Sequence, residues 1–358
     1  MSAELRDSVD KALRDRVDKA LHDFLQRATA PLAQISPDLE PFGAVTEAFV
    51  LDGGKRLRPA FCFWGHRAAG GADSDEIVRA AASLELLQAC ALVHDDVIDA
   101  SDTRRGAPAV HRRFAATHRA QGWRGDPEAF GAAAAILLGD LALIWADTML
   151  AESGMQPAAL QRAFATWDAM RIEVMCGQYL DVVEQARGGG SVERALRVAR
   201  YKSAKYTVER PLHLGAVLAG ADDELLTVLS DYGLPLGEAF QLRDDVLGVY
   251  GDPAETGKPA GDDLREGKRT VLVAFAIESA NDAQQDTMRR LLGDPALDDD
   301  GVTILRDVIA ATGAVDRVER LIDERLDQAQ TALQSPLIAP PAVDALRALA
   351  NAATRRAH

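Results

Sequence analysis

Residues 74–99 read SDEIVRAAASLELLQACALVHDDVID, a long apolar segment that ends in a cluster of aspartates. Its apolar residues recur with the helical period, which predicts one long helix. The pattern returns in residues 222–249, whose last residues include DDVLG at 244–248. Most other segments also have a helical period, and no turn dipeptide separates alternating apolar segments as in a β-hairpin. The sequence therefore predicts an all-α chain.

The expected helices cover most of the chain, and glycines mark most of the breaks between them. No stretch has the composition of a linker, so we expect a single domain over residues 1–358. Residues 1–30 are expected to form an amphipathic helix that packs on the body, with an oligomer contact as the alternative. The expected helices lie near 4–28, 36–51, 57–69, 74–99, 127–152, 157–186, 191–203, 206–219, 222–249 and 269–281, with several more to the C-terminus.

Composition narrows the class of partner. The 40 Lys and Arg residues against 55 Asp and Glu residues give a net charge of −15. Nucleic-acid binding and adhesion to anionic membranes both need a basic surplus, so neither is expected. Asp140 and Asp147 interrupt the most apolar stretch, residues 132–149, which we interpret as a buried core helix and not a membrane span.

The cysteines and the first residues indicate a compartment. There are 3 cysteines, an odd number, and none of them has the spacing of a metal site. A disulfide framework or zinc site is therefore not expected, and a reducing compartment is. The charged N-terminal segment has no apolar region of the kind that signal peptides carry. We expect a cytoplasmic protein.

The aspartate clusters indicate a metal. Asp95 and Asp99 are four residues apart and share one helical face, where their charges repel unless a cation lies between them. Hard oxygen ligands suit Mg²⁺, which keeps several waters and accepts phosphate oxygens. One such cluster is also consistent with a solvated helix end. The second cluster at 244–248 makes the pair more specific, because the two could face each other across a cavity.

Basic segments near these clusters indicate a phosphate ligand. Gly53 and Gly54 precede a helix start, whose backbone N–H groups favour a phosphate, and Lys55 and Arg58 follow. Arg and Lys both recognise phosphate oxygens, although any one segment could be solvated surface charge. The acidic net charge does not oppose this, because it describes the long-range field and not the site. The other basic segments are Arg104-Arg105, KSAK at 202–205 and TGKPAGDDLREGKRT at 256–270.

With these motifs the chain resembles the trans-isoprenyl diphosphate synthases, the polyprenyl synthetase family, from about Gly53 to Thr270. The resemblance implies an all-α bundle around a deep central cavity, a homodimer, and a Mg²⁺-dependent prenyltransferase of isoprenoid biosynthesis. Its substrates would be isopentenyl diphosphate and an allylic diphosphate. The matching segments are GGKRLRP, LLQACALVHDDVIDASDTRRG, GQYLD, YKSAK, FQLRDDVLGVYGD and GKPAGDDLREGKRT.

The resemblance also implies a role for each matching residue. About three Mg²⁺ ions would be held by Asp95, Asp99 and Asp244, with Asp96, Asp181 and Asp245 in support. Isopentenyl diphosphate would be held by Lys55, Arg58, Gln88 and Arg105. The allylic diphosphate would be held by Arg104, Lys202 and Lys258, with Lys268 near a closing lid. The catalytic group would be Lys202, Ser203, Gln241 and Arg104, of which the first three line the region where positive charge develops.

The chain departs from the family pattern at three positions. Gly248 stands where the second motif often has a fifth-position Asp, and glycine cannot bind a metal. Ser203 stands where Thr is common, which keeps the hydroxyl. Lys205 adds a cation to which the resemblance assigns no role.

Residues just before the first motif predict the product. The growing chain would run along this helix, where each turn rises about 5.4 Å, close to one isoprene unit. Family members that stop at fifteen carbons often carry bulky aromatics four and five residues before the motif, where this chain has small Cys90 and Ala91. Leu87 lies next on that face. We predict geranylgeranyl diphosphate, with farnesyl or longer-chain products as alternatives.

Two other functions are compatible with parts of this pattern. A terpene cyclase uses the same ionisation chemistry but needs no isopentenyl diphosphate site, so Lys55, Arg58 and Arg105 argue against it. A non-catalytic subunit of a heteromeric synthase would be expected to have lost aspartates or cations, and nearly all are present here.

Overall fold

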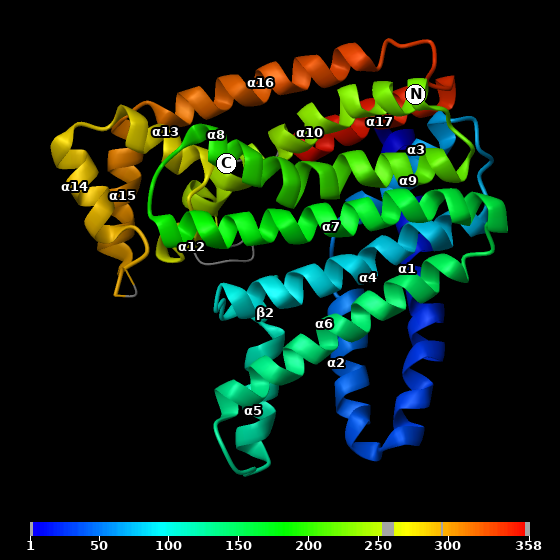
Figure 1. The fold of residues 1–358 in the computed structure, drawn as a ribbon, viewed down its shortest axis with the longest axis horizontal. Helices are drawn as coiled ribbons and strands as arrows, with labels where there is room; N and C mark the ends of the chain where they lie inside the picture. Colours follow the sequence, from blue (N-terminus) through cyan, green and yellow to red (C-terminus); the bar gives the residue numbers. More distant parts are fainter. Residues whose placement is uncertain (1–2, 253–260, 295, 355–358) are drawn as a thin grey trace. The chain divides into compact units, whose positions relative to one another are not determined.

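The computed structural model describes residues 3–252, 261–294 and 296–354, with side chains from residue 11 onward. Helices make up nearly all of it (Figure 1), so the predicted all-α class is confirmed. The strands of the described residues are β1 (Thr103–Arg104) and β2 (Ala107–Pro108), a short antiparallel pair. The chain divides into two compact units. The first contains Met1–Phe63 and Ala72–Leu160, and the second contains Trp64–Gly71 and Gln161–His358.

The first unit is built around one apolar helix, α4. Helix α6 and the N-terminal helix α1 both pack on α4, and α5 packs on α6. Helix α1 contacts α4 and α2 and buries Leu13, Val17, Leu21 and Leu25, which share one helical face. The helices of this unit are α1 (Ala3–Ile35), η1 (Pro37–Leu39), α2 (Glu40–Leu51), α3 (Leu57–Ala68, whose last residues fall in the second unit), α4 (Asp75–Ile98), α5 (Val110–Ala120) and α6 (Pro127–Ala151).

Two features of this unit differ from the expected helices. Helix α1 continues past residue 28 to Ile35 and contains Pro31. Helix α5 was not among the expected helices, although the few apolar residues of this mostly polar and basic segment have helical spacing. The segment becomes a helix by burying Val110, Phe114 and Ala115 in its contact with α6. Tertiary packing stabilises it more than local propensity does.

Helix α6 corrects the interpretation of residues 132–149 as a buried core helix. Its inner face packs on α4 and α5, but Phe130, Leu137 and Ile144 are 36%, 62% and 61% exposed and form a stripe along the helix. By length and hydropathy α4 and α6 are the candidate membrane spans of the described residues. The apolar window of α4 is 72% buried and that of α6 is 39% buried. Hydropathy alone could not tell which face of α6 has a partner.

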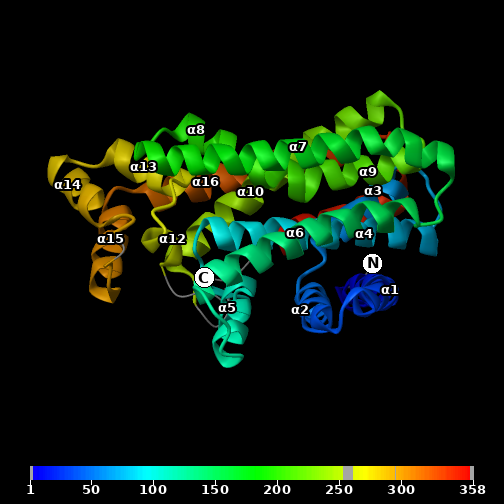
Figure 2. The ribbon, with the colours of Figure 1, turned by 60° about the horizontal axis from the view of Figure 1, so that its bottom comes forward.

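In the second unit, α10 packs against η2 and α16. Figure 2 shows α10 beside α16. Its core gathers Leu242 and Val246 of α10 with Leu272 and Phe275 of α13 and Val318 of α16. The helices are α7 (Pro157–Arg187), α8 (Val192–Val198), η2 (Ala199–Glu209), α9 (Arg210–Leu218), α10 (Asp223–Tyr250), α12 (Asp262–Arg265), α13 (Val271–Ser279), α14 (Asp282–Leu291), α15 (Asp299–Ala311), α16 (Ala314–Ala332) and α17 (Pro340–Thr354).

The expected break between helices 191–203 and 206–219 is wrong. Helices α8, η2 and α9 follow one another without a gap, and η2 is an 11-residue π-helix. No glycine or proline lies in residues 199–209, so the helix widens there and does not end. Such wide turns are frequent at functional sites, and this one carries the YKSAK motif.

Candidate active site

The first aspartate motif lies at the C-terminal end of α4. Asp96 is fully buried, whereas Asp95 and Asp99 are partly exposed on one face. Arg104 of β1 donates from Nε to Oδ1 of Asp96 at 2.9 Å, and its Nη2 bonds the same oxygen. Arg104 Nη2 also lies 3.4 Å from Oδ2 of Asp95. Asp96 therefore anchors the β1–β2 loop, while Asp95 and Asp99 present carboxylates in the i, i+4 arrangement predicted for metal binding.

A histidine and a glycine set the position of this motif. The His94 ring lies against Gly139 of α6, and its Nε2 is 3.1 Å from the carbonyl oxygen of Ile136. A Cβ atom on Gly139 would overlap this ring and lie 2.9 Å from Cε1. The absence of a side chain at residue 139 thus lets α4 and α6 approach closely, as the close packing of interiors requires. His94 is a packing residue.

The loop between α2 and α3 carries a buried arginine that the sequence analysis missed. Arg56 has a φ of 51°, in the left-handed region, and is 5% exposed. Its guanidinium donates to Oε2 of Glu85 and to Oδ1 of Asp18, both at 2.7 Å. It also donates to the carbonyl oxygen of Val50 at 3.1 Å. These bonds fix the loop around Arg56. Lys55 and Arg58 lie on either side of Arg56 in the sequence.

The predicted cations of isopentenyl diphosphate binding gather at this loop. Burial lowers the pKa of the Arg105 guanidinium, and the positive charges of Arg56, Arg104 and Arg58 lower it further, while Glu85 opposes them. Arg105 Nη1 donates to the carbonyl oxygen of Asp52 at 2.6 Å and so closes the end of α2. Several cations repel one another here, which an anionic ligand would relieve.

The other predicted members of this group are less closely defined. Lys55 is exposed beside the buried Arg56, as a ligand-binding cation needs to be. Gln88 is partly buried on α4, one turn after Glu85, so the two side chains share a face.

The predicted chain-length residues differ in exposure. Cys90 and Leu87 are 4% and 2% exposed, whereas Ala91 is partly exposed. Burial raises the pKa of the Cys90 thiol to about 12, so this thiol is not a nucleophile at neutral pH. Of the three, Ala91 is the partly exposed residue, and it lies one helical turn before Asp95.

The second aspartate motif lies near the C-terminal end of α10. Asp244 is partly exposed, and Asp245 is 5% exposed. Gln241 Nε2 donates to Oδ1 of Asp245 at 2.7 Å, and the backbone N–H of Val271 donates to the same carboxyl group. Burial raises the pKa of Asp245 to about 8, with further contributions from Asp263 and Asp244. The buried Asp245 carboxyl group therefore holds its proton more strongly than an exposed aspartate does.

The YKSAK segment of η2 lies between two glycines. A Cβ atom on Gly177 of α7 would lie 2.6 Å from the carbonyl carbon of Tyr201, and one on Gly237 of α10 would lie 2.6 Å from Cα of Ala204. The backbone of η2 thus contacts α7 and α10 directly. Lys202 Nζ donates to Oδ2 of Asp181 at 2.7 Å, which joins two of the residues predicted to bind diphosphate and metal. Ser203, the residue after Lys202 on η2, is partly exposed.

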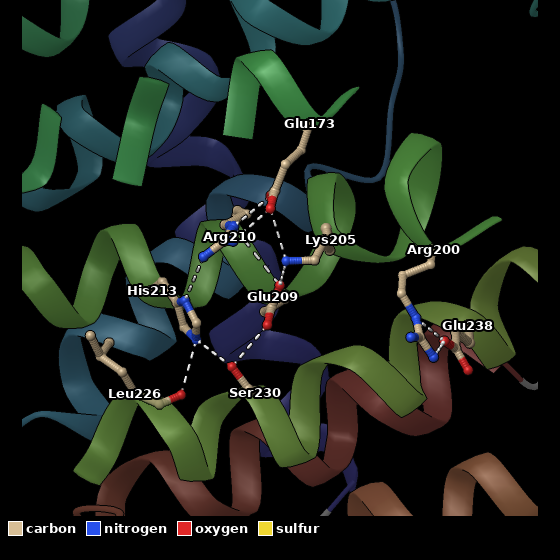
Figure 3. Close-up of polar contacts among 9 residues, drawn as sticks. All are labelled: Glu173, Arg200, Lys205, Glu209, Arg210, His213, Leu226, Ser230 and Glu238. Carbon is tan, nitrogen blue, oxygen red and sulfur yellow. Dashed lines mark hydrogen bonds and ion pairs between the residues drawn. The ribbon is translucent and has the colours of Figure 1, made fainter. Parts of the chain in front are cut away.

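Lys205, to which the sequence assigned no role, belongs to a network of charged side chains (Figure 3). Its Nζ lies 2.9 Å from Oε1 of Glu173 and 3.1 Å from Oε2 of Glu209. Arg210 binds both oxygens of Glu173, through Nε and Nη2, each at 2.7 Å. Two cations and two carboxylates balance one another. Lys205 thus acts within the fold, and the network ties η2 to α7 and α9.

The network continues through a histidine to α10. Arg210 Nη1 lies 3.3 Å from Nδ1 of His213, and because arginine only donates, Nδ1 is the acceptor. Nε2 then carries the proton and donates to the carbonyl oxygen of Leu226 at 3.0 Å. Ser230 Oγ lies 3.0 Å from Nε2 and donates to Oε1 of Glu209 at 2.8 Å. Burial lowers the pKa of His213, which keeps this ring neutral.

The segment after the second motif supplies the last predicted residues. Lys268 Nζ lies 2.6 Å from Oε2 of Glu266 and 3.6 Å from Oδ1 of Asp263. Lys258 lies outside the described residues.

The donor set suits magnesium. Within the residues that the structure describes, no three His, Cys, Asp or Glu side chains lie close enough together to hold a metal ion by themselves. The carboxylates of Asp95 and Asp99 and of Asp244 each offer hard oxygens and leave room for other ligands. Mg²⁺ takes one or two carboxylates and completes its shell with water and substrate phosphates, so this sparse donor set fits it.

The profile of the polyprenyl synthetase family matches residues 40–308, a segment that contains both aspartate motifs and all the basic segments described above. The match covers more than half of the chain. The chain belongs to the polyprenyl synthetase family.

Solved structures and characterised relatives agree with this assignment. The chain is 44% identical to the geranylgeranyl pyrophosphate synthase of Corynebacterium glutamicum, whose crystal structure contains isoprenyl diphosphate and magnesium. The TM-score is 0.93, with 96% of this chain and 99% of the other covered. The geranylfarnesyl diphosphate synthase of Aeropyrum pernix is 34% identical over 297 residues, 82% of this chain and 86% of that protein. The geranylgeranyl diphosphate synthase of Sulfolobus acidocaldarius is 30% identical over 278 residues, 77% and 78% of the two chains.

These findings confirm the predicted fold class and the predicted class of enzyme. This polyprenyl synthetase is a prenyltransferase, and its helices are those of the family's all-α fold. Members of the family use Mg²⁺ together with isopentenyl diphosphate and an allylic diphosphate.

Proposed function

We propose that this protein condenses isopentenyl diphosphate with an allylic diphosphate to form geranylgeranyl diphosphate as the main product. The observation that carries the proposal is the combination, on one chain, of two outward aspartate positions at helix ends and a cluster of arginines around a glycine loop. The names of two relatives, from Corynebacterium and Sulfolobus, support the twenty-carbon product. The name of the Aeropyrum relative, geranylfarnesyl diphosphate synthase, keeps a longer product as the alternative.

The substrates would be bound by different groups. Lys55, Arg58, Gln88 and Arg105 would hold isopentenyl diphosphate at the glycine loop, where Arg56 and Glu85 keep the loop in place. Asp95, Asp99 and Asp244 would hold about three Mg²⁺ ions, which when bound neutralise the diphosphate of the allylic substrate and make it a better leaving group. Arg104, Lys202 and Lys258 would bind the same diphosphate.

The reaction would then follow from position and electrostatics. The carbon–oxygen bond of the allylic diphosphate would ionise, and the dipoles of Ser203 and Gln241 would stabilise the cation that forms. The double bond of isopentenyl diphosphate, held nearby, attacks this cation and forms the new carbon–carbon bond. A proton is lost to the released diphosphate, and a longer trans allylic diphosphate results. Water must be excluded throughout, since it would quench the cation.

We also propose a cytoplasmic homodimer. The exposed apolar stripe of Phe130, Leu137 and Ile144 on α6 supports a second copy of the chain as the partner, because contiguous apolar surface of this kind marks an interface. Sedimentation of the purified protein would test this, with a monomer at micromolar concentration as the contrary result.

Product analysis tests the proposed function. The purified chain is incubated with labelled isopentenyl diphosphate and each allylic primer in Mg²⁺, and the products are separated by radio-HPLC. We expect a twenty-carbon diphosphate. A clean stop at fifteen carbons would refute the predicted product. Hydrocarbon release from geranylgeranyl diphosphate alone would indicate a cyclase, and absence of turnover by the chain alone would indicate a non-catalytic subunit.

A further inference from the structure

The glycine that interrupts the second aspartate motif contacts an aspartate of another helix. A Cβ atom added to Gly248 of α10 would overlap Oδ2 of Asp263 and lie 2.6 Å from its Cγ. Gly248 lies within α10, and its φ is not in the left-handed region. The backbone therefore does not require glycine, and alanine would favour the helix more. The space that the Asp263 carboxylate occupies accounts for glycine at this position.

The two motifs then have the same pattern of carboxylates. In the first motif, Asp99 follows Asp95 by four residues on one helical face. In the second, the position four residues after Asp244 is Gly248, which brings no carboxylate of its own. The carboxylate of Asp263 lies against Gly248, where the side chain of a residue at position 248 would be.

We propose that Asp263 supplies the second outward carboxylate of the α10 motif and that Gly248 and Asp263 act as one unit in binding the magnesium diphosphate. The inference rests on the proposed function and adds to it a residue outside the motif. Asp263 contributes to the charge at this site because its carboxylate is close enough to interact with that of Asp245. Hard oxygen ligands from two elements of the chain are compatible with Mg²⁺, which binds few protein carboxylates at a time.

Local contacts hold the Asp263 carboxylate in this orientation. Its Oδ1 faces Lys268 Nζ at 3.6 Å, which leaves Oδ2 directed at Gly248. The backbone N–H of Lys268 donates to the carbonyl oxygen of Asp263 at 2.9 Å, and the Asp263 side chain is 16% exposed. Because the carboxylate belongs to α12 and not to α10, the complete motif depends on the packing of α12 against α10.

Two variants remove the carboxylate from this place by different routes. Asp263→Asn removes its charge. Gly248→Ala keeps Asp263 but puts a methyl group where its carboxylate lies, and the higher helix propensity of alanine opposes unfolding. Asp262→Asn, one residue away on α12, is the control for a lost negative charge. The double variant Gly248→Asp/Asp263→Ala moves the carboxylate from α12 to α10.

The measurement is the rise in Tm on titration of Mg²⁺ in the presence of inorganic pyrophosphate. We expect Asp263→Asn and Gly248→Ala each to raise the half-maximal Mg²⁺ concentration about tenfold, which corresponds to about 1.4 kcal/mol. Asp262→Asn should stay within about twofold of wild type, and the double variant should recover most of the loss.

The outcomes separate this inference from the proposed function. If both single variants have the half-maximal Mg²⁺ concentration of wild type while the unmodified enzyme forms prenyl diphosphates, the role of Asp263 is overturned and the proposed function stands. A double variant that binds no better than Asp263→Asn would also contradict it. If the unmodified enzyme forms no product, the proposed function fails, and the inference fails with it.

Discussion

The two aspartate motifs end long apolar helices, α4 with 24 residues and α10 with 28, but their buried carboxylates have different partners. In both motifs the first Asp is partly exposed and the second is buried. Asp96 is ion-paired with Arg104, whereas Asp245 accepts hydrogen bonds from Gln241 and from a backbone amide and is repelled by Asp244 and Asp263. The same sequence pattern thus gives one motif whose buried carboxylate is ion-paired and one whose buried carboxyl group is hydrogen-bonded and has a raised pKa. In each motif the first aspartate, which we propose to bind the metal, is partly exposed, and the contacts of the buried second aspartate depend on its neighbours.

The largest expected effect is on turnover, and it should be the same for the two motifs. Asp95→Ala and Asp244→Ala should each lower turnover about 10³-fold, as the loss of a main electrostatic stabiliser does. Incorporation of labelled isopentenyl diphosphate measures it, with Asp15→Ala on the exposed face of α1 as the control. Unimpaired turnover in either variant would contradict the metal assignment for that motif.

Replacement of the inner aspartates should separate the motifs. Asp96→Asn leaves Arg104 without its buried counter-charge, and we expect the free energy of unfolding to fall by about 3 kcal/mol. Asp245→Asn replaces a buried carboxyl group of raised pKa by a neutral amide that keeps an acceptor for Gln241, so the loss should be at most about 1 kcal/mol. Urea unfolding without metal measures both. Equal losses would show that the partners of the two carboxylates do not matter.

Replacement of the glycines at which the two motif helices pack closely should cost different amounts of stability. Gly139→Ala would place its methyl group against the His94 side chain, which can rotate, and we expect a cost of about 1 kcal/mol. Gly237→Ala would meet the backbone of η2 at Ala204, which cannot rotate away, and we expect about 3 kcal/mol. Thermal unfolding of the two variants tests the order, and the reverse order would contradict these packing contacts.

The smaller of the two expected effects on turnover concerns the charged network of Lys205, which includes residues of α10. Lys205→Met should leave Glu173 and Glu209 with less compensation and shift η2, which carries Lys202 and Ser203. We expect kcat to fall about tenfold, equivalent to about 1.4 kcal/mol, with little change in KM for isopentenyl diphosphate. Lys205→Arg should restore most of the rate. A change confined to KM would place Lys205 at the substrate instead.

Several parts of the site were predictable because they depend on local spacing. Asp95 and Asp99 share a helical face because they are four residues apart in a helix, and Lys55 and Arg58 follow a glycine turn that is visible in the sequence. The roles of Arg56 and Glu85 were not predictable. Their pairing joins residues 29 positions apart, and nothing in either local sequence distinguishes Arg56 from its neighbour Arg58. Asp263 was missed for the same reason, since its partner Gly248 has no side chain to indicate it.

The sequence by itself determined the all-α class, the two aspartate motifs and the membership in a diphosphate-using family, because helical period and motif spacing are local properties. Tertiary structure decided which aspartates are buried, that residues 199–209 form a π-helix, and that Lys205 is bound within the fold. It also decided that one apolar face of α6 stays exposed. These properties depend on which distant side chains and backbones meet, and packing and charge compensation between them are set only when the helices come together.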